Sequence, residues 1–279
     1  MGSNTPSSSS RRRALLYGRR KGPKLSAHKE ELRRTLLPKL ALRLEQGVDP
    51  STYFLPPPRG EVEAVLSDSE GRASGGGTPS TSPPSRLTFG LPTSPQGEGD
   101  YSVADVWLEV GFGSGEHLLE QARAHPSVGL IGAEPYEAGV AKLLSKLAGE
   151  TNIRIHEGDA RDIVEALPDA CLGRVFILFP DPWPKTRHRK RRFVQTEMLD
   201  ALARVMKQGA ELRIASDDSG YVGWTLERLM AHPDFAWTAE GAADWKTRPQ
   251  GWPQTRYEAK ALHGPPAYLL FVRQAKMAS

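Results

Sequence analysis

Four acidic side chains each follow a short apolar stretch of this 279-residue chain. They are Glu109, Glu134, Asp159 and Asp181. In an open parallel sheet, ligands bind beyond the carboxyl ends of the strands, so we expect these four carboxylates to meet at one site. A single acid at a strand end is more often a helix cap than a ligand. Four in succession favour a ligand-binding site.

The last of these acids, Asp181, lies in a rigid loop followed by a block of positive charge. Residues 175–179 have the pattern of a buried strand, and the prolines of PDPWP (180–184) end it, because proline has no amide hydrogen for the ladder and fixes its own φ. Residues 185–192 then contain six Lys or Arg and one His. Taken by itself, such a charge run is equally well explained as the solvent-exposed start of a helix. Its attachment to Asp181 and Trp183 favours an active site that acts on a polyanion.

A glycine-rich turn follows the first of the four apolar stretches. Gly111, Gly113 and Gly115 let the backbone approach a ligand closely, but the sequence is not GxGxxG, the dinucleotide fingerprint. Glu109, directly before the turn, would repel a pyrophosphate but not a cationic ligand such as a sulfonium amino acid. Glu134 can accept both hydroxyls of a ribose. Together these residues favour S-adenosylmethionine over a nicotinamide cofactor.

The elements that must position these residues occupy the second part of the chain. Strand patterns cover 105–110, 130–133, 153–156, 175–179, 211–215, 235–238 and 267–272, and helical patterns cover 116–124, 138–147, 163–167, 192–206 and 221–231. This alternation predicts an α/β fold with helices on both faces of a mostly parallel sheet. The last two strands are joined by a loop pattern and are expected to form an antiparallel hairpin at one edge.

Charge and composition divide the chain into three parts. Residues 1–47 contain twelve Lys or Arg and three acids, against 25 and 30 in the remainder, so a basic arm precedes an acidic body. Such an arm is typical of nucleic-acid binders, with a basic tail that has no partner as the alternative. Within this part, residues 26–44 predict a helix capped by Ser26 and kinked or split at Pro38.

The second part, residues 48–104, is rich in Gly, Pro and Ser and predicts a flexible insertion. Only residues 53–55 and 87–89 in it are able to pack. Residues 105–279 form the catalytic domain.

The order of the motifs GFGSG, GAEPY, GDA, LFPDPWPKTRHRKRR, ASDD and TRYE resembles that of the bacterial tRNA (guanine-N7)-methyltransferase family. The resemblance covers roughly residues 105–273 and the arm motif GRRKG near residue 18. The Phe-Pro-Asp-Pro-Trp block with its basic cluster is the most distinctive part. Residues 48–104 depart from the family pattern. The resemblance implies a class I methyltransferase (Rossmann-like) fold with seven strands, one of them an antiparallel edge strand.

The resemblance also implies roles for individual residues. Glu109, Glu134, Asp159 and Asp181 would bind S-adenosylmethionine, and Asp181 would also line the reaction centre. The implied tRNA contacts are Lys185, Arg187, His188, Arg189, Lys190, Arg191 and Arg192. The target nucleotide, guanine 46 of the variable loop, would be held by Asp217, Thr255, Arg256, Tyr257 and Glu258. For Asp217 and its neighbour Asp218, capping of the following helix is the alternative.

Methyl transfer to guanine N7, the reaction that the resemblance implies, needs no general base. Guanine N7 has an in-plane lone pair and loses no proton when it is methylated, so catalysis rests on positioning. Carboxylates at Asp181, Asp217 or Glu258 can follow the positive charge as it moves onto the purine and accept hydrogen bonds from guanine N1 and N2. We therefore expect Asp181 to orient and stabilise the guanine.

Two other functions are compatible with these motifs. An amino-group methyltransferase acting on another nucleic acid also uses an acid or amide followed by prolines and an aromatic residue, but the second proline here follows the aromatic. A non-catalytic tRNA-binding protein would need neither the glycine turn nor the set of acids. The histidines lack ligand spacing, so we assign no metal, and no apolar run is long enough to span a bilayer. The single cysteine, Cys171, favours a reducing cytoplasm, and we expect a monomer or a weak homodimer.

Overall fold

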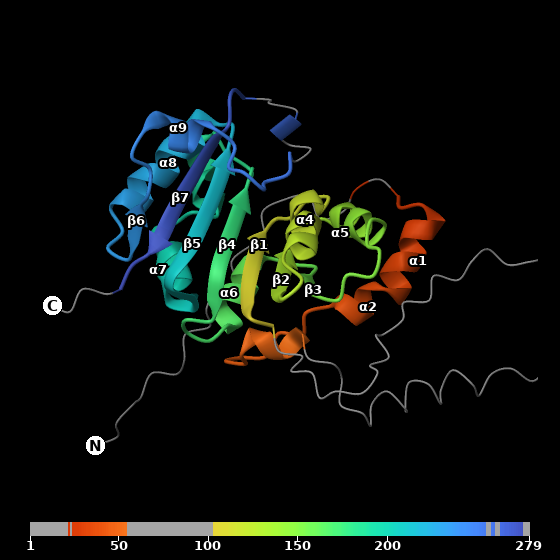
Figure 1. Cartoon of the computed structure of the whole chain (residues 1–279). Helices are drawn as coiled ribbons and strands as arrows, with labels where there is room; N and C mark the ends of the chain where they lie inside the picture. The colour runs from red at the N-terminus through yellow and green to blue at the C-terminus, as the bar shows by residue number, and fades with distance from the viewer. Residues whose placement is uncertain (1–21, 23, 55–102, 255–257, 260–262, 276–279) are drawn as a thin grey trace, which may run out of the picture.

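The computed structural model describes residues 22, 24–54, 103–254, 258–259 and 263–275. In these residues seven strands form one sheet in the order β3-β2-β1-β4-β5-β7-β6 (Figure 1). They are β1 (Asp105–Val110), β2 (Val128–Ala133), β3 (Ile153–His156), β4 (Leu172–Leu178), β5 (Met206–Ser216), β6 (Phe235–Trp237) and β7 (Ala267–Arg273). Strands β1 to β5 are parallel, whereas β7 is antiparallel to both β5 and β6. The expected mostly parallel sheet is confirmed, with the reversed strand lying just inside the edge strand β6.

The strand order reverses at the centre of the sheet. From β1 the chain continues outward to β2 and β3, and it then returns to place β4 on the other side of β1. The two central strands are in parallel register, with Trp107 beside Arg174 and Val110 beside Ile177. A crevice for a ligand opens beyond the carboxyl ends of the strands at such a reversal. The loops after β1 and β4 therefore flank the expected binding site.

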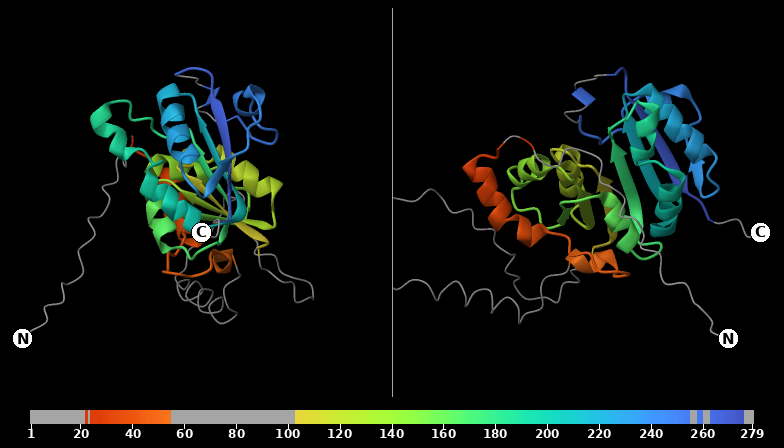
Figure 2. Two further views of the ribbon diagram at one scale, coloured as in Figure 1. Left: turned by 90° about the vertical axis from the view of Figure 1, so that its left-hand side faces the viewer. Right: turned by 180° about the vertical axis from the view of Figure 1, so that it is seen from behind.

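Helices cover both faces of the sheet, each over its own apolar core (Figures 1 and 2). On one face lie α4 (Glu116–Ala124) and α5 (Glu137–Leu144), and on the other lie α6 (Ala160–Ala166), α7 (Thr196–Val205) and α8 (Ser219–Met230). Every residue of β2 is buried, and so are the last four residues of β4. Burial on both faces explains why the central strands read as unbroken apolar runs.

The predicted N-terminal helix is split, as Pro38 suggested. Helix α1 (Ala27–Thr35) begins at the Ser26 cap, and α2 (Leu37–Leu40) has the proline in its first turn, where no amide hydrogen is needed. The predicted helix was too long, because the chain extends after Leu40 and the Leu42 amide donates to the Ile155 carbonyl at 2.8 Å. The open edge of β3 offers backbone groups that compete with a further helical turn.

The first residues of the predicted flexible insertion belong to the folded body. Residues 50–54 form a short 3-10 helix, η1 (Pro50–Phe54), and Phe54 is 9% exposed. The Arg154 guanidinium donates to the Tyr53 carbonyl at 2.7 Å and lies 4.9 Å from the centre of the Phe54 ring. Tyr53 and Phe54 were two of the residues expected to pack. Residues 55–102 lie outside the described residues, so their flexibility stays a prediction.

Besides η1, two more short helices were not predicted. The basic block forms a 3-10 helix, η2 (Thr186–Arg191), and α9 (Ala242–Lys246) lies between β6 and β7, where a loop was expected. One or two turns are too short to give a hydrophobic period. None of the helices in the described ranges has the length and apolar character that crossing a bilayer requires.

Candidate active site

The glycine turn after β1 packs closely against the start of helix α5. Gly111, Gly113 and Gly115 have φ of 70°, 58° and 75°, a conformation that side chains with a Cβ rarely adopt. Helix α5 approaches the turn so closely that a Cβ on Gly139 would lie 2.3 Å from the Gly113 carbonyl oxygen. The turn is therefore a cradle of backbone groups at the carboxyl end of the central strand.

Glu134 is held against this turn from the end of β2. Its carboxylate accepts from the amides of Gly113 at 2.7 Å and Tyr136 at 2.8 Å, and the residue is only 7% exposed. Burial raises the pKa of Glu134 to about 7, and the nearby carboxylates of Asp181 and Glu109 add to the rise. Three of the four predicted acids thus act on one another at one site. Such a site favours a cationic ligand with hydroxyl groups to donate.

Glu109 has a partner that the sequence did not predict. Its Oε2 lies 2.8 Å from Nδ1 of His117, and the two residues are 3% and 2% exposed. The imidazole packs edge-on against Phe176, with ring centres 4.6 Å apart. A buried carboxylate needs such a partner, because an unpaired charge is costly in an apolar core. His117 follows Glu109 by eight residues, and only the turn into α4 brings the two together.

Asp159 acts as a helix cap, the alternative reading of a lone acid at a strand end. It precedes α6 and accepts from the Arg161 amide at 3.0 Å, and it also forms an ion pair with the Arg161 side chain at 3.0 Å. The carboxylate lies beside the loop that ends β3. Its role as a cofactor ligand stays a prediction.

The loop with Asp181 is rigid and strained at both ends. Phe179 and Trp183 have φ of 49° and 43°, values that are unusual for residues with a Cβ. The Phe179 amide donates to the Ala215 carbonyl at 2.8 Å, which fixes the start of the loop to β5. Asp181 is exposed, but the surrounding loop displaces enough water to raise its pKa. Strain of this kind is typical of functional sites.

Arg192 does not lie where the prediction placed it. It is 3% exposed, donates from Nε to the Pro182 carbonyl at 2.8 Å, and lies 4.9 Å from the centre of the Trp224 ring. Arg192 is thus buried and not on the surface, unlike most of its block, and its contact with tRNA stays a prediction. Its guanidinium instead holds the Asp181 loop, because its planar donors can bond a carbonyl and stack on a ring together.

We expect Arg192→Met to destabilise the chain by about 1–3 kcal/mol, because the Pro182 carbonyl loses its donor. Methyl transfer should fall with it, because the Asp181 loop loses a fixed point. Arg189→Met, an exposed neighbour in the same block, is the matched control and should leave stability unchanged. Thermal unfolding of both variants tests this, and equal melting temperatures would contradict the assigned role.

The remaining members of the basic block divide into exposed cations and two residues that lie against Trp183. Lys185, Arg187, Arg189 and Lys190 are exposed. His188 and Arg191 are half-buried against the indole, with the His188 ring centre at 5.8 Å and the Arg191 guanidinium at 4.9 Å. The helix η2 thus presents positive charge directly beside Asp181.

Asp217, another predicted substrate residue, follows the end of β5, next to Asp218. Asp218 caps α8 by accepting from the Tyr221 amide at 2.7 Å, whereas Asp217 accepts from the His263 amide at 3.2 Å. The helix-capping alternative is thus correct for Asp218 and not for Asp217.

Glu258 is 7% exposed, and its carboxylate accepts from Arg248 at 2.7 Å and from the Tyr268 hydroxyl. The rest of its predicted block, Thr255, Arg256 and Tyr257, lies outside the described residues.

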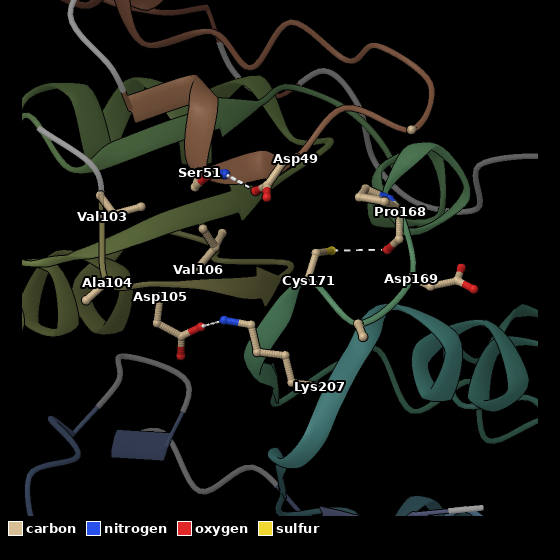
Figure 3. A pocket seen from close by; sticks show the side chains of 12 residues that line it. Asp49, Ser51, Val103, Ala104, Asp105, Val106, Pro168, Asp169, Cys171 and Lys207 are labelled. Carbon is tan, nitrogen blue, oxygen red and sulfur yellow. Dashed lines mark hydrogen bonds and ion pairs between the residues drawn. The ribbon is translucent and has the colours of Figure 1, made fainter.

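Asp181 lines neither of two cavities that the described residues form. The larger, about 410 Å³, lies at the amino ends of β1 and β5, where Lys207 pairs with Asp105 at 2.6 Å (Figure 3). That is the opposite end of the sheet from the carboxylates. The smaller, about 300 Å³, adjoins Tyr268 and Arg248, the partners of Glu258. No group of His, Cys, Asp and Glu in the described ranges could hold a metal ion.

The sheet topology and the acids at its carboxyl edge define a class I methyltransferase fold. A family described as "Putative methyltransferase" matches residues 104–267. A protein of Rhodospirillum rubrum named tRNA (guanine-N(7)-)-methyltransferase is 46% identical over 269 residues, which are 95% of this chain and 90% of that protein.

Two further relatives bear the same name. One from Brucella anthropi is 39% identical over 92% of this chain and 94% of its own length. One from Ruegeria sp. (strain TM1040) is 53% identical over 63% of this chain and 71% of its own. The chain belongs to the tRNA (guanine-N7)-methyltransferase family. The R. rubrum alignment covers 95% of the chain and the Ruegeria alignment covers 63% of it, and the departure of residues 48–104 from the family pattern stays a prediction.

Proposed function

We propose that this protein transfers a methyl group from S-adenosylmethionine to N7 of guanine in tRNA, at position 46 of the variable loop. The observation that carries the proposal is the arrangement of Asp181. Its loop leaves β4 beside the acids of the cofactor site and leads directly into the exposed basic helix η2. A methyl donor and a polyanion can thus meet at one carboxylate.

The residues around the glycine turn fit S-adenosylmethionine. Glu134 is buried and fixed by two amides, as an acceptor for ribose hydroxyls requires. The group of carboxylates suits a cation and would repel the pyrophosphate of a dinucleotide. When bound, S-adenosylmethionine supplies an electrophilic methyl group on its sulfonium. Glu109, Glu134 and Asp159 are the residues that would hold it, together with the backbone of the glycine turn.

The chain's own contribution is orientation and charge. Asp181, on a loop fixed by Arg192 and by the Phe179 amide, holds the guanine so that N7 faces the methyl group. As positive charge moves to the purine, its carboxylate stabilises that charge. Asp217 and Glu258 accept from the guanine N1 and N2 donors. No proton leaves N7, so none of these groups has to act as a base.

The first experiment is methyl transfer from labelled S-adenosylmethionine to bulk tRNA, followed by nucleoside analysis. We expect 7-methylguanosine, and we expect it to disappear when the tRNA carries adenine at position 46. Methylation of an exocyclic amine would instead support the amino-group methyltransferase. Cofactor binding without transfer to any tRNA would favour the non-catalytic tRNA-binding protein.

The exposed basic residues of η2 should contact phosphate groups. We expect the triple variant Arg187→Gln, Arg189→Gln and Lys190→Gln to weaken tRNA binding and to reduce the slope of log K against log salt by about 1 for each lost phosphate contact. Lys246→Gln on α9, another exposed cation, is the control. Filter binding at several salt concentrations tests this, and an unchanged slope would place the tRNA elsewhere.

A further inference from the structure

Helix α1 carries an arginine, Arg33, whose side chain contacts two loops at the carboxyl ends of β2 and β3. Arg33 donates to Glu157 at 2.6 Å and lies 3.8 Å from the carboxylate of Glu137. The three side chains are 27%, 24% and 33% exposed, so water only partly screens the ion pairs. The helix lies along α5 in the two views that show both (Figures 1 and 2).

Both partners of Arg33 are neighbours of predicted cofactor ligands. Glu157 comes directly after β3, two residues before Asp159, and Glu137 is the first residue of α5, three residues after Glu134. The two loops lie side by side, because the Glu134 amide donates to the His156 carbonyl at 3.0 Å. Arg33 spans them from outside the sheet.

We propose that Arg33 is a positioning residue for the cofactor site, holding the loop with Glu134 and the loop with Asp159 in a fixed relation. This rests on the proposed function, in which these loops bind the ribose and adenine of S-adenosylmethionine. A planar guanidinium is suited to the task, because its separate nitrogens reach two carboxylates at once. Helix α1 packs on the core through Leu32 and through Leu36 at its end, but neither leucine fixes the loops after β2 and β3, which only Arg33 of this helix reaches with its ion pairs.

The neighbouring residue provides a matched control. Arg34 lies on the same helix, but its side chain is 73% exposed and it forms an ion pair with Glu31, within α1 itself. Replacing either arginine with methionine removes one positive charge and keeps a helix-forming side chain with an apolar stem. Only the change at residue 33 should weaken binding of the cofactor.

A positioning role and a purely electrostatic role of Arg33 predict opposite changes in the affinity for S-adenosylmethionine when Arg33 is removed. S-adenosylmethionine carries one more positive charge than S-adenosylhomocysteine. If Arg33 acted only through its field, removing it would strengthen binding of the cation relative to the neutral analogue. If Arg33 positions the two loops, removing it weakens binding of both ligands to a similar extent.

The test is calorimetric titration of the full chain, without tRNA, with S-adenosylmethionine and with S-adenosylhomocysteine. We expect Arg33→Met to weaken both ligands roughly fivefold, Arg33→Lys to lie between it and the unaltered chain, and Arg34→Met to change neither. In Glu157→Gln, the further change Arg33→Met should cost less than it does in the unaltered chain. In methyl-transfer assays, Arg33→Met should raise the KM for S-adenosylmethionine and leave kcat unchanged.

Several results would overturn the proposal. If Arg33→Met binds both ligands as well as the unaltered chain does, or strengthens only the cation, the loops do not depend on Arg33 and only this inference fails. Equal losses in Arg33→Met and Arg34→Met would point to the helix and not to the contact. If the unaltered chain binds neither ligand, the proposed function fails with it.

Discussion

Asp181→Ala should lower kcat/KM for tRNA methylation roughly 100-fold to 1,000-fold, the usual effect of removing one group that stabilises charge in a transition state. The loop around Asp181 is fixed at Phe179 and at Pro182 by hydrogen bonds that do not involve the Asp181 side chain. The measurement is single-turnover methyl transfer with saturating S-adenosylmethionine. Affinity for tRNA should change little, because η2 keeps its charge.

The variant Asp181→Asn separates orientation from base catalysis. Because N7 loses no proton, the amide should retain more activity than alanine, through the hydrogen bonds that its oxygen can still accept. The methyl-transfer step should also keep its pH profile in this variant. A step that depends steeply on an acidic pKa in the unaltered chain, and loses this dependence in Asp181→Asn, would show that Asp181 acts as a base.

Affinity for S-adenosylmethionine should rise with pH up to about 7 and then level off. The pKa of the Glu134 carboxyl is raised to about 7 by burial, so the group is mostly neutral below that pH. The ionised form accepts ribose hydroxyls and attracts the cationic cofactor, so binding is favoured once the proton has left. Below pH 7 the affinity should therefore rise about tenfold per pH unit. Glu134→Gln should bind weakly at every pH and lose this dependence.

Calorimetry in two buffers of different ionisation enthalpy measures the same linkage directly. Near pH 6 the unaltered chain should release close to one proton when it binds S-adenosylmethionine, and Glu134→Gln should release almost none. The pKa of Asp181 is also raised, so Asp181→Asn serves to separate its contribution. Almost no proton release from the unaltered chain would mean that Glu134 stays protonated in the complex.

The fold, and the succession of acids that follow its strands, could be predicted because both depend on local sequence patterns. Buried strands such as β2 are apolar throughout, and the turns after them carry the glycines and acids. The parallel arrangement then places Glu109, Glu134 and Asp181 at one edge, and the carboxylates of Glu109 and Asp181 add to the rise that burial causes in the pKa of Glu134. These features follow from residue types a few positions apart.

The features that the sequence did not predict depend on contacts between distant residues. Arg192 has the same charge as its exposed neighbours, and only its burial against Pro182 and Trp224 separates it from them. His117 and Arg33 find their partners through the packing of α4 on β1 and of α1 on α5. Charge runs and helical patterns do not predict such pairings, because each describes only one segment of the chain.

The position of β7 has a consequence for how the sheet is completed during synthesis. Strand β7 comes after β6 in the chain, yet it separates β6 from β5 and pairs with both. Until residues 267–273 leave the ribosome, β6 has no partner and one side of β5 remains open. Tyr268, which donates to Glu258, arrives with the same strand. A nascent chain that stalls before this point therefore exposes an unpaired strand edge, a feature that favours aggregation with other chains.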